Sequence, residues 1–375
     1  MRIVRLANFV TPRSGGLRTA LRCLGAGYRA AGHEPVLIVP GERAADEMIG
    51  PDRVVTLPGP VLPGTGGYRV LAGRRRLRRL LEELEPDRLE VSDRSTLRWT
   101  GAWARANGIP SLMVSHESLT GLLGVWGAPA AIGQRLADRL NGRSAATYDR
   151  VVCTTDWAAA EFRRIGAPNL TQVPLGVDLD AFHPDRHNPA LRAEYAADGE
   201  VLLVHCSRLS PEKRPDLAID ALAALRAGGV PATLVVVGDG PRRTALGQRA
   251  AGLPVHFTGF LPDRDRVAGL LASADVVVAP GPVETFGLAG LEALACGTPV
   301  VVNAASALPE VVGAAGLGAD GTGEAFAEAI VTLLGRPEPE RRATARARAE
   351  QFGWAASVEG FLRAHDAPVG LAVPA

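Results

Sequence analysis

The chain has 375 residues, of which 47% are apolar and 22% charged, and its formal net charge at neutral pH is +1. This length holds two domains of ordinary size, and the near-neutral charge argues against nucleic acid binding by the surface as a whole, so we expect no nucleic acid partner. No apolar run approaches the length of a membrane span, and the N-terminal stretch, which carries charges, is not typical of a signal peptide.

Short apolar runs alternate with helix-like stretches along the chain. In the first half the apolar runs lie at residues 3–10, 35–39, 88–91, 111–114 and 150–153. After a proline-rich connector at 174–185 they resume at 200–205, 232–237, 255–257, 275–279 and 299–302. Such alternation is typical of a parallel, doubly wound sheet. The sequence therefore predicts an α/β protein with two Rossmann-like domains joined near residue 180.

Two features of the first half are candidates for a ligand site. Gly15 and Gly16 follow the first predicted strand, where backbone without side chains can approach a phosphate or a sugar, and a simple tight turn is the alternative. The third glycine of a dinucleotide fingerprint is missing, which argues against an NAD-dependent enzyme. His116 ends the fourth strand, where it can donate to a sugar hydroxyl or a reacting oxygen, or serve as a structural histidine.

A basic segment precedes the third predicted strand. Its arginines cover the start of a predicted helix whose leucines form an apolar stripe: Arg74, Arg75, Arg76, Arg78 and Arg79. Positive charge at this end of a helix opposes the helix dipole. An anionic membrane surface or a phosphorylated acceptor would compensate it, and the alternative is an ordinary solvated helix in a protein rich in arginine.

The four cysteines stand far apart, without the spacing of a zinc site or a redox pair. We interpret them as reduced core residues of a cytoplasmic protein: Cys23, Cys153, Cys206 and Cys296.

The loop after the first strand of the second half offers two cations, Arg208 and Lys213. Fixed positive charge at the end of a strand suits a leaving diphosphate, because bond cleavage leaves negative charge on its oxygens. Lys213 is the single lysine among 41 basic residues, so its compact ammonium is retained against a strong bias toward arginine. The alternative is an ordinary exposed ion pair.

Two further strand ends carry glycines, in VVVGDGPRR at 235–243 and FTGFLPDRDRV at 257–267. We interpret both as backbone-lined walls of the same site, which makes Gly238, Phe260 and Leu261 candidate residues. Asp263 and Asp265 superficially resemble a metal-binding acid pair, but their place at a helix start favours capping.

The stretch from 274 to 302 is typical of a strand, loop, helix and strand, with Glu284 on the loop and Glu292 eight positions later in the helix. Free backbone N–H groups and the positive end of the helix dipole meet where this helix begins, near Gly287. Two acids beside an anion-binding helix end suit a ligand that has both phosphate and hydroxyl groups. A nucleotide-sugar is such a ligand.

A last helical segment lies at about 352–366. Its apolar side chains fall near one face, which predicts that the helix docks against a domain: Phe352, Trp354, Val358 and Phe361.

Together these motifs resemble the retaining nucleotide-sugar glycosyltransferases of GT-B fold, family four, also called glycosyl transferases group 1. The resemblance rests on SGG at 14–16, His116, the R-x4-K pattern from Arg208, VGDGP at 237–241, TGF at 258–260 and the specific E-x7-E element from Glu284. It implies two Rossmann-like domains that face each other across a cleft. An acceptor-binding domain would span residues 1–178 and a donor-binding domain 179–351, with the helix at about 352–366 crossing back to the first domain.

The resemblance implies roles for the charged candidates. Arg208 and Lys213 would hold the diphosphate and neutralise it as it leaves. Glu284 would contact hydroxyls of the transferred sugar, and Glu292 would accept hydrogen bonds from the ribose hydroxyls. His116 would contact the sugar near its reacting face.

It also implies roles for backbone groups. Those at Phe286, Gly287 and Leu288 would bind sugar and phosphate, and Gly16 would let the first loop approach the diphosphate. Enzymes of this kind are similar in needing no bound metal, because side chains and a helix end neutralise the phosphate. The nucleotide-sugar is then a co-substrate, and no cofactor is expected.

The inventory of motifs also bears on mechanism. Retention by double displacement needs a carboxylate on the far face of the sugar, about 5 Å from its partner, and no residue of the motifs has a clear claim to that role. Attack on the same face, with the departing phosphate receiving the acceptor proton, fits a site rich in cations and is our working hypothesis.

The overall pattern is most similar to actinobacterial mannosyltransferases, which implies GDP-mannose as donor and a glycolipid such as a phosphatidylinositol mannoside as acceptor. Arg266 lies where a cation would reach guanine O6. Alternatives are another GDP- or UDP-sugar with a small-molecule acceptor, an epimerase or phosphorylase of related fold, and a non-catalytic binding module. The predicted location is the cytoplasm, with peripheral attachment to the inner face of the plasma membrane through the basic segment at 74–79.

Overall fold

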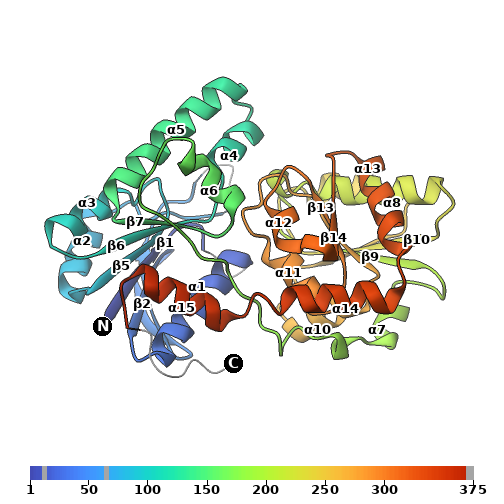
Figure 1. Cartoon of the computed structure of the whole chain (residues 1–375), viewed down its shortest axis with the longest axis horizontal. Coiled ribbons are helices and arrows are strands. Elements are labelled where there is room, and N and C mark those ends of the chain that lie inside the picture. The colour runs from blue at the N-terminus through green and yellow to red at the C-terminus, as the bar shows by residue number, and fades with distance from the viewer. Residues whose placement is uncertain (11–14, 63–66, 369–375) are drawn as a thin grey trace. The chain divides into compact units, whose positions relative to one another are not determined.

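The structure, a computed structural model, describes residues 1–10, 15–62 and 67–368. The chain forms two compact units (Figure 1). The first comprises Met1–Gly176 together with the C-terminal segment that starts at Trp354, and the second comprises Val177–Gly353. The sequence predicts a change of domain at 178/179 and a return near 352, and the structure places these changes at 176/177 and 353/354.

The first unit is built around an eight-stranded sheet with the order β3-β4-β2-β1-β5-β6-β7-β8. All neighbouring strands are parallel except β3 and β4, which form an antiparallel pair at one edge. The strands are β1 Arg2–Ala7, β2 Glu34–Gly41, β3 Ala45–Ile49, β4 Asp52–Pro58, β5 Arg88–Ser92, β6 Ser111–Ser115, β7 Arg150–Cys153 and β8 Leu170–Gln172. Valine, leucine and isoleucine fill most buried strand positions, as expected for a sheet covered on both faces.

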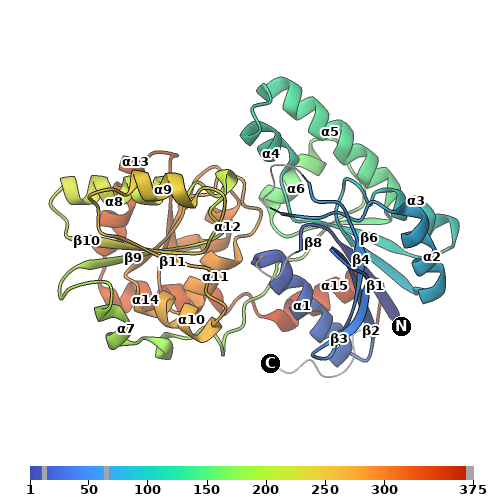
Figure 2. The ribbon, with the colours of Figure 1, turned by 180° about the vertical axis from the view of Figure 1, so that it is seen from behind.

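The helices of the first unit include one from the far end of the chain. They are α1 Gly16–Ala30, α2 Arg74–Leu84, α3 Trp99–Ala106, α4 Leu119–Val125, α5 Ala130–Thr147, α6 Asp156–Arg163 and α15 Trp354–Ala364. Helices α1 and α15 lie side by side (Figures 1 and 2). They approach so closely that a Cβ atom at Gly27 would lie 2.2 Å from Val358, so this contact requires glycine. The predicted return of the C-terminal helix is confirmed.

One part of the docking prediction is wrong. Val358 and Phe361 are buried, as predicted for the docking face of α15. Phe352, however, precedes the helix and belongs to the second unit, where its ring centre lies 5.9 Å from that of Phe286. The helix starts two residues later than the apolar spacing predicts, because Gly353, a poor helix residue, separates Phe352 from Trp354.

A buried polar network also joins α15 to the sheet. Glu90 on β5 accepts hydrogen bonds from Arg5 at 2.8 Å and from Tyr28 at 2.7 Å, and it lies 3.1 Å from Nε2 of His365, which follows α15. Each of the four side chains is at most 2% exposed. Burial alone would raise the pKa of Glu90, but Arg5, His365 and Tyr28 hold it well below its usual range.

The second unit is built around a fully parallel six-stranded sheet with the order β11-β10-β9-β12-β13-β14. The strands are β9 Val201–Cys206, β10 Ala232–Val237, β11 Val255–Gly259, β12 Val276–Ala279, β13 Val300–Asn303 and β14 Gly316–Ala319. The chain adds strands outward from β9 to β11, then returns to the other side of β9 for the remaining three. This reversal between β9 and β12 is a topological switch point.

Helices cover both faces of this sheet. They are α7 Pro189–Ala193, α8 Pro215–Ala227, α9 Arg243–Arg249, α10 Arg264–Ser273, α11 Leu288–Ala295, α12 Leu308–Val312, α13 Gly323–Leu334 and α14 Glu338–Ala349. Figures 1 and 2 show α8, α9 and α13 on one side of the strands and α7, α10 and α14 on the other. The predicted doubly wound architecture is therefore confirmed in both units, and β3, β4, β8 and β14 are additions to the strands that the sequence predicts.

Candidate active site

The switch point of the second unit brings two loops together. β9 and β12 are neighbours, with Leu203 opposite Val276, and their carboxyl ends lead into loops at 207–214 and 280–287. Ligands of open α/β sheets bind outside the carboxyl ends of the strands at such a point. These loops carry the two cations and the first glutamate that the sequence singles out, so the topology gathers them at one edge of the sheet.

Lys213 and Glu284 meet between these loops. Nζ of Lys213 lies 2.5 Å from Oε1 of Glu284, and the two side chains are 30% and 20% exposed. Lys213 ends a short 3₁₀ turn that begins at Pro211. The carbonyl of Glu284 accepts a hydrogen bond from the amide of Ala307 at 2.9 Å. The backbone therefore fixes both partners, and the pair still reaches solvent.

Arg208 lies in the same loop as Lys213 and is half-buried. The residue before it, Ser207, is held by a histidine that sequence reasoning missed. Nδ1 of His205 lies 2.9 Å from the carbonyl of Val278, and its Nε2 lies 2.8 Å from the hydroxyl of Ser207. Burial lowers the pKa of His205, so the ring is neutral while it ties the loop to β12. The sequence does contain a sign of this histidine, because it is a polar residue inside an otherwise apolar strand, VLLVHC.

Gly238 follows β10 and brings its backbone against the loop of Arg208. Its φ is 130°, and a Cβ atom at this position would lie 2.0 Å from the carbonyl oxygen of Ser207. The amide of Gly238 donates to the carbonyl of Gly259 at 2.9 Å. Any side chain here would displace the loop that carries the cations, which explains why the position is glycine.

Helix α11 begins at Leu288, directly after Gly287, which has a left-handed φ of 76°. A Cβ atom at Gly287 would lie 2.3 Å from the side chain of Leu308, so this turn requires glycine for its space as well as its conformation. Phe286 and Leu288 are buried on either side of it. Because the amides of a first helical turn lack partners within the helix, the start of α11 offers donors to an anionic group.

Glu292 lies one turn farther along α11 and pairs with a different cation. Its Oε1 lies 3.2 Å from the guanidinium of Arg264, which also lies 4.9 Å from the ring centre of Phe182. Burial raises the pKa of Glu292, while Arg264 acts in the opposite direction. Sequence reasoning missed this pairing, whose partners are 28 positions apart. It did identify the cap: Asp263 accepts hydrogen bonds from two amides of the first turn of α10.

The remaining donor-binding candidates separate into two groups. Phe260 follows β11 and is 41% exposed, and Leu261 beside it is half-buried. An exposed ring at the carboxyl end of a strand can stack on a nucleotide base. Arg266 is already engaged, because its guanidinium lies 2.7 Å from Glu194 and 3.4 Å from the hydroxyl of Tyr195.

In the first unit, His116 follows β6 at the carboxyl edge of the sheet. Its Nε2 lies 3.1 Å from the hydroxyl of Ser92, which ends β5. Burial lowers the pKa of His116 to about 4, and the cation of Arg94 acts in the same direction. The ring is therefore neutral at neutral pH and suited to hydrogen bonding with an uncharged hydroxyl.

A buried clamp, missed by sequence reasoning, holds the loop after β6. Arg94 donates to the hydroxyl of Ser115 at 2.6 Å and to the carbonyl of Glu117. Glu161 accepts from the hydroxyl of Ser118 at 2.6 Å. The side chains of Arg94 and Glu161 are 5% and 9% exposed and lie 3.9 Å apart. Neither residue belongs to a local motif, so only the fold reveals the clamp.

Gly15 and Gly16 stand at the start of α1. Gly15 precedes the helix and Gly16 is its first residue, and both are exposed. Among the described residues outside its immediate chain neighbours, no atom would lie within 4 Å of a Cβ atom at Gly15. Ser14, the first residue of the SGG motif, lies outside the described residues.

The basic segment forms the start of α2, with three of the four leucines of this helix buried and its arginines exposed. Arg78 pairs with Glu82 at 2.8 Å, and the guanidinium of Arg74 lies 5.8 Å from the ring centre of Trp99. Three arginine side chains have no hydrogen bond or ion pair within residues 1–10, 15–62 and 67–368: Arg75, Arg76 and Arg79.

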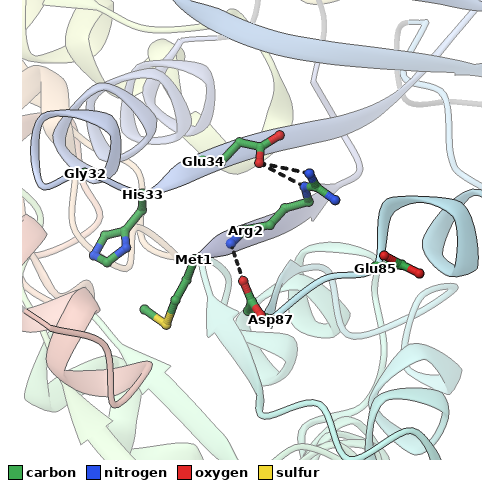
Figure 3. Close-up of a pocket in the computed structure, with 7 residues that line it drawn as sticks. All are labelled: Met1, Arg2, Gly32, His33, Glu34, Glu85 and Asp87. Atoms are coloured by element: carbon green, nitrogen blue, oxygen red, sulfur yellow. Dashed lines mark hydrogen bonds and ion pairs between the residues drawn. The ribbon is translucent and has the colours of Figure 1, made fainter.

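A polar hollow of about 460 Å³ lies at the amino edge of the sheet of the first unit, opposite the carboxyl edge that carries His116 (Figure 3). Two of its charged side chains form an ion pair, in which the guanidinium of Arg2 lies 3.0 Å from Glu34, and the amide of Arg2 donates to Asp87 at 2.6 Å. The hollow is therefore separate from the carboxyl edge that carries His116.

Among the described residues, no group of three or more His, Cys, Asp or Glu side chains is placed to hold a metal ion. Within the same residues, no helix is both long enough and apolar enough to cross a membrane.

Each half of the chain matches a known family of protein domains. Residues 15–176 match the glycosyl transferase 4-like domain, and residues 200–336 match glycosyl transferases group 1. The chain is 54% identical to the GDP-mannose-dependent alpha-(1-6)-phosphatidylinositol dimannoside mannosyltransferase of Mycobacterium tuberculosis, over 96% of this chain and 95% of that protein. It is 29% identical to a GDP-mannose-dependent alpha-mannosyltransferase of the same species, over 80% of this chain and 78% of that protein.

A solved structure shares the fold. Sucrose-phosphate synthase from Thermosynechococcus elongatus has a TM-score of 0.79 to this chain at 20% identity, over 97% of this chain and 98% of that one. The predicted GT-B fold is thereby confirmed. From its two domain matches and its 54% identity to a mannosyltransferase, the chain belongs to the glycosyltransferases, in the family of glycosyl transferases group 1.

Proposed function

We propose that this chain transfers mannose from GDP-mannose to a phosphatidylinositol mannoside and retains the configuration of the sugar. The donor and acceptor are those in the name of the relative that is 54% identical over 96% of the chain. The structural observation that carries the proposal is the Lys213–Glu284 pair at the switch point. In this pair the ammonium of Lys213, which can bind phosphate, lies beside the carboxylate of Glu284, which can accept hydrogen bonds from sugar hydroxyls.

The proposed donor site lies at the carboxyl edge of the second unit. Arg208, Lys213 and the first turn of α11 bind the diphosphate, since each offers positive charge or free amides. Glu284 accepts hydrogen bonds from hydroxyls of the sugar. Glu292 accepts from the ribose through the oxygen that does not face Arg264, and the exposed ring of Phe260 stacks on the base.

The proposed acceptor side is the carboxyl edge of the first unit. His116 stays neutral there, because burial lowers its pKa to about 4. A neutral ring donates or accepts one hydrogen bond without adding charge near the sugar. The clamp of Arg94 and Glu161 positions this ring by fixing the loop after β6.

The proposed reaction proceeds on one face of the sugar. The oxygen of an acceptor hydroxyl forms a bond to the anomeric carbon, and the bond from that carbon to the phosphate oxygen breaks. The electron pair of the broken bond stays on GDP, and the hydroxyl proton passes to the leaving phosphate oxygen. Arg208 and Lys213 stabilise the negative charge that develops on the diphosphate.

The proposal places the enzyme in the cytoplasm, at the inner face of the plasma membrane. All four cysteines are free thiols, which supports a reducing compartment. The unpaired arginines of α2 are available to anionic lipid headgroups, and such contacts weaken as salt screens them.

A screen of GDP- and UDP-sugars by thermal shift tests the donor. A donor at one hundred times its Kd stabilises the protein by about 2.7 kcal/mol, so GDP-mannose is expected to raise the melting temperature most. Glu292→Ala is expected to reduce that shift to a small fraction, because about 100-fold weaker binding leaves a stabilisation of only about 0.4 kcal/mol at the same concentration. Glu194→Ala, which removes the partner of Arg266, is expected to leave the shift unchanged. A larger shift with a UDP-sugar, or an equal shift in the Glu292→Ala protein, contradicts the donor assignment.

A further inference from the structure

The exposed large apolar side chains of the described residues are unevenly distributed. Four of the nine lie between positions 125 and 136, on α4, on α5 and in the turn between them: Val125, Trp126, Ile132 and Leu136. Their exposed fractions run from 36% to 74%, with the largest for Trp126. We call these four residues the apolar tip. Large apolar side chains that gather on one exposed element indicate a contact surface, whereas single exposed apolar residues need no explanation.

The apolar tip continues along the exposed face of α5 into a row of arginines. Positions 132, 136, 139 and 143 follow helical spacing and share the face opposite the buried residues of α5. We call three arginines of this helix the basic collar: Arg135, Arg139 and Arg143. Their side chains make no hydrogen bond or ion pair within the described residues. Asp138, the one acid of the hairpin at 119–147, is neutralised by Arg164 at 2.5 Å, so the face has a net positive charge.

The hairpin of α4 and α5 is anchored at its root and exposed at its tip. Both helices appear side by side at the top of the first unit in the two opposite views (Figures 1 and 2). At the root, Glu161 accepts hydrogen bonds from the hydroxyl of Ser118 and from the amide of Thr120, at 2.6 and 2.9 Å. At the turn, the amide of Ala128 donates to the carbonyl of Leu123 at 2.9 Å. The tip is therefore presented by an ordered element.

We propose that this hairpin docks on an anionic bilayer, with the apolar tip between the headgroups and the acyl chains and the basic collar against lipid phosphates. The inference rests on the proposed function, because a phosphatidylinositol mannoside acceptor resides in a bilayer. Helices with an apolar end and arginines on the same exposed surface bind the membrane interface by combining apolar burial with attraction to anionic lipid. Trp126 suits the boundary between headgroups and acyl chains, because the ring of tryptophan is apolar and its N–H is polar.

The position of the hairpin gives the docking a consequence for the reaction. Helix α4 begins three residues after His116, so the loop of the proposed acceptor site leads directly into the docking element. A bilayer held by the tip brings lipid headgroups to the edge of the unit that carries this loop. Helix α2 differs, because it has exposed arginines but no exposed large apolar side chain. It can add attraction to the surface, whereas the hairpin supplies insertion.

Co-sedimentation with vesicles tests the inference. The tip variant combines Trp126→Ser with Ile132→Ser, which are 74% and 61% exposed. The matched control combines Met48→Ser with Ile49→Ser, two residues of edge strand β3 that are 61% and 58% exposed. With vesicles of phosphatidylcholine and phosphatidylglycerol, the tip variant is expected to bind about tenfold more weakly than the wild type, and the control as the wild type does. The collar variant, Arg135→Ser with Arg139→Ser, is expected to lose the part of the binding that depends on anionic lipid and low salt.

Two further readouts separate this inference from the proposed function. GDP-mannose binding by calorimetry is expected to be unchanged in the tip variant, which also shows that the variant is folded. Transfer to phosphatidylinositol mannoside in vesicles is expected to fall about tenfold, while transfer to its deacylated, water-soluble form stays the same. A protein that binds vesicles through the tip but does not bind GDP-mannose contradicts the proposed function and leaves the docking surface in place.

Other outcomes overturn the inference itself. If the wild type and the tip variant bind vesicles equally well, the apolar tip does not dock on the bilayer. The same follows if the Met48→Ser, Ile49→Ser control loses as much vesicle binding as the tip variant. If sedimentation velocity shows a wild-type dimer that the tip variant converts to a monomer without loss of vesicle binding, the surface joins two copies of the chain and not a bilayer.

Discussion

Lys213 and Glu284 are 71 positions apart in the chain and form a 2.5 Å ion pair across the neighbouring ends of β9 and β12. The pair exists because the strand order reverses between these two strands, so that the loops after them adjoin. In the proposed complex the diphosphate takes the ammonium of Lys213 and the sugar hydroxyls take the carboxylate of Glu284. The same contact therefore orders both side chains before the donor arrives.

Replacing Lys213 by alanine is expected to lower kcat by about 10²–10³-fold, because the charge that stabilises the leaving diphosphate is removed. Lys213→Arg is expected to restore only part of this activity, since a planar guanidinium does not reproduce the geometry of an ammonium. Steady-state release of GDP in the presence of acceptor measures both. A Lys213→Ala enzyme with wild-type kcat and a raised KM assigns this residue to binding alone.

Replacing Glu292 by alanine is expected to weaken GDP-mannose binding by about 3 kcal/mol, or about 100-fold, if two charge-assisted bonds to the ribose are lost. Isothermal titration calorimetry gives the Kd directly. The matched control is Glu194→Ala, because each of these acids pairs with an arginine of α10 and only Glu292 is proposed to touch the donor. Equal Kd values for the two variants contradict the ribose assignment.

Glu90→Gln is expected to destabilise the first unit by about 3–5 kcal/mol at neutral pH, because it leaves Arg5 buried without its counter-charge. The folded pKa of Glu90 lies below the unfolded value of about 4.3, so this stabilisation is complete above that pH and is lost as the pH falls below it. Urea unfolding of wild type and variant is expected to show a difference that is constant from about pH 7 to about pH 5 and shrinks in acid.

The exposed pair of Arg2 and Glu34 provides the control for that series. Its side chains are 33% and 50% exposed, so Glu34→Gln is expected to cost at most about 1 kcal/mol. A Glu90→Gln effect as small as this one, or one that grows in acid, contradicts the account of the buried network.

His116 is expected to remain neutral through the physiological range, because burial lowers its pKa to about 4. Activity is therefore not lost through protonation of this ring between about pH 5 and about pH 8. Titration of the ring proton signals by NMR, assigned with a His116→Gln variant, measures the pKa. A value near the ordinary 6.5 contradicts both the burial of the ring and its proposed role as an uncharged hydrogen-bonding group.

The fold was predictable where strands are buried on both faces. The run VVVA at Val276–Ala279 is uniformly apolar, VVVN at Val300–Asn303 is apolar up to its last residue, and helix signals separate the two. The four unpredicted strands lack this signature for different reasons. β3 is mostly exposed, β4 is mostly half-buried and reads DRVVTLP, β8 has three residues, and β14 reads GLGA, which contains two glycines. Their pairing depends on neighbours in the sheet and not on their own side chains.

The candidate site divides in the same way. Lys213 and Glu284 stand on loops next to strong strands, so their place at one edge followed from the alternation of elements. The contacts that fix the site were not predictable, because they join segments without local spacing. Examples are the 28-residue separation of Arg264 and Glu292 and the 73-residue separation of His205 and Val278. Only the register of the packed elements brings such partners together.

Transfer by the purified full-length chain is measured by following labelled mannose from GDP-mannose into phosphatidylinositol mannoside. We expect one molecule of GDP for each mannosyl lipid formed, an α-linkage in the product by NMR, and loss of transfer in the Lys213→Ala enzyme. Release of GDP that does not depend on the acceptor, or a product with inverted configuration at the anomeric carbon, would contradict the proposed function.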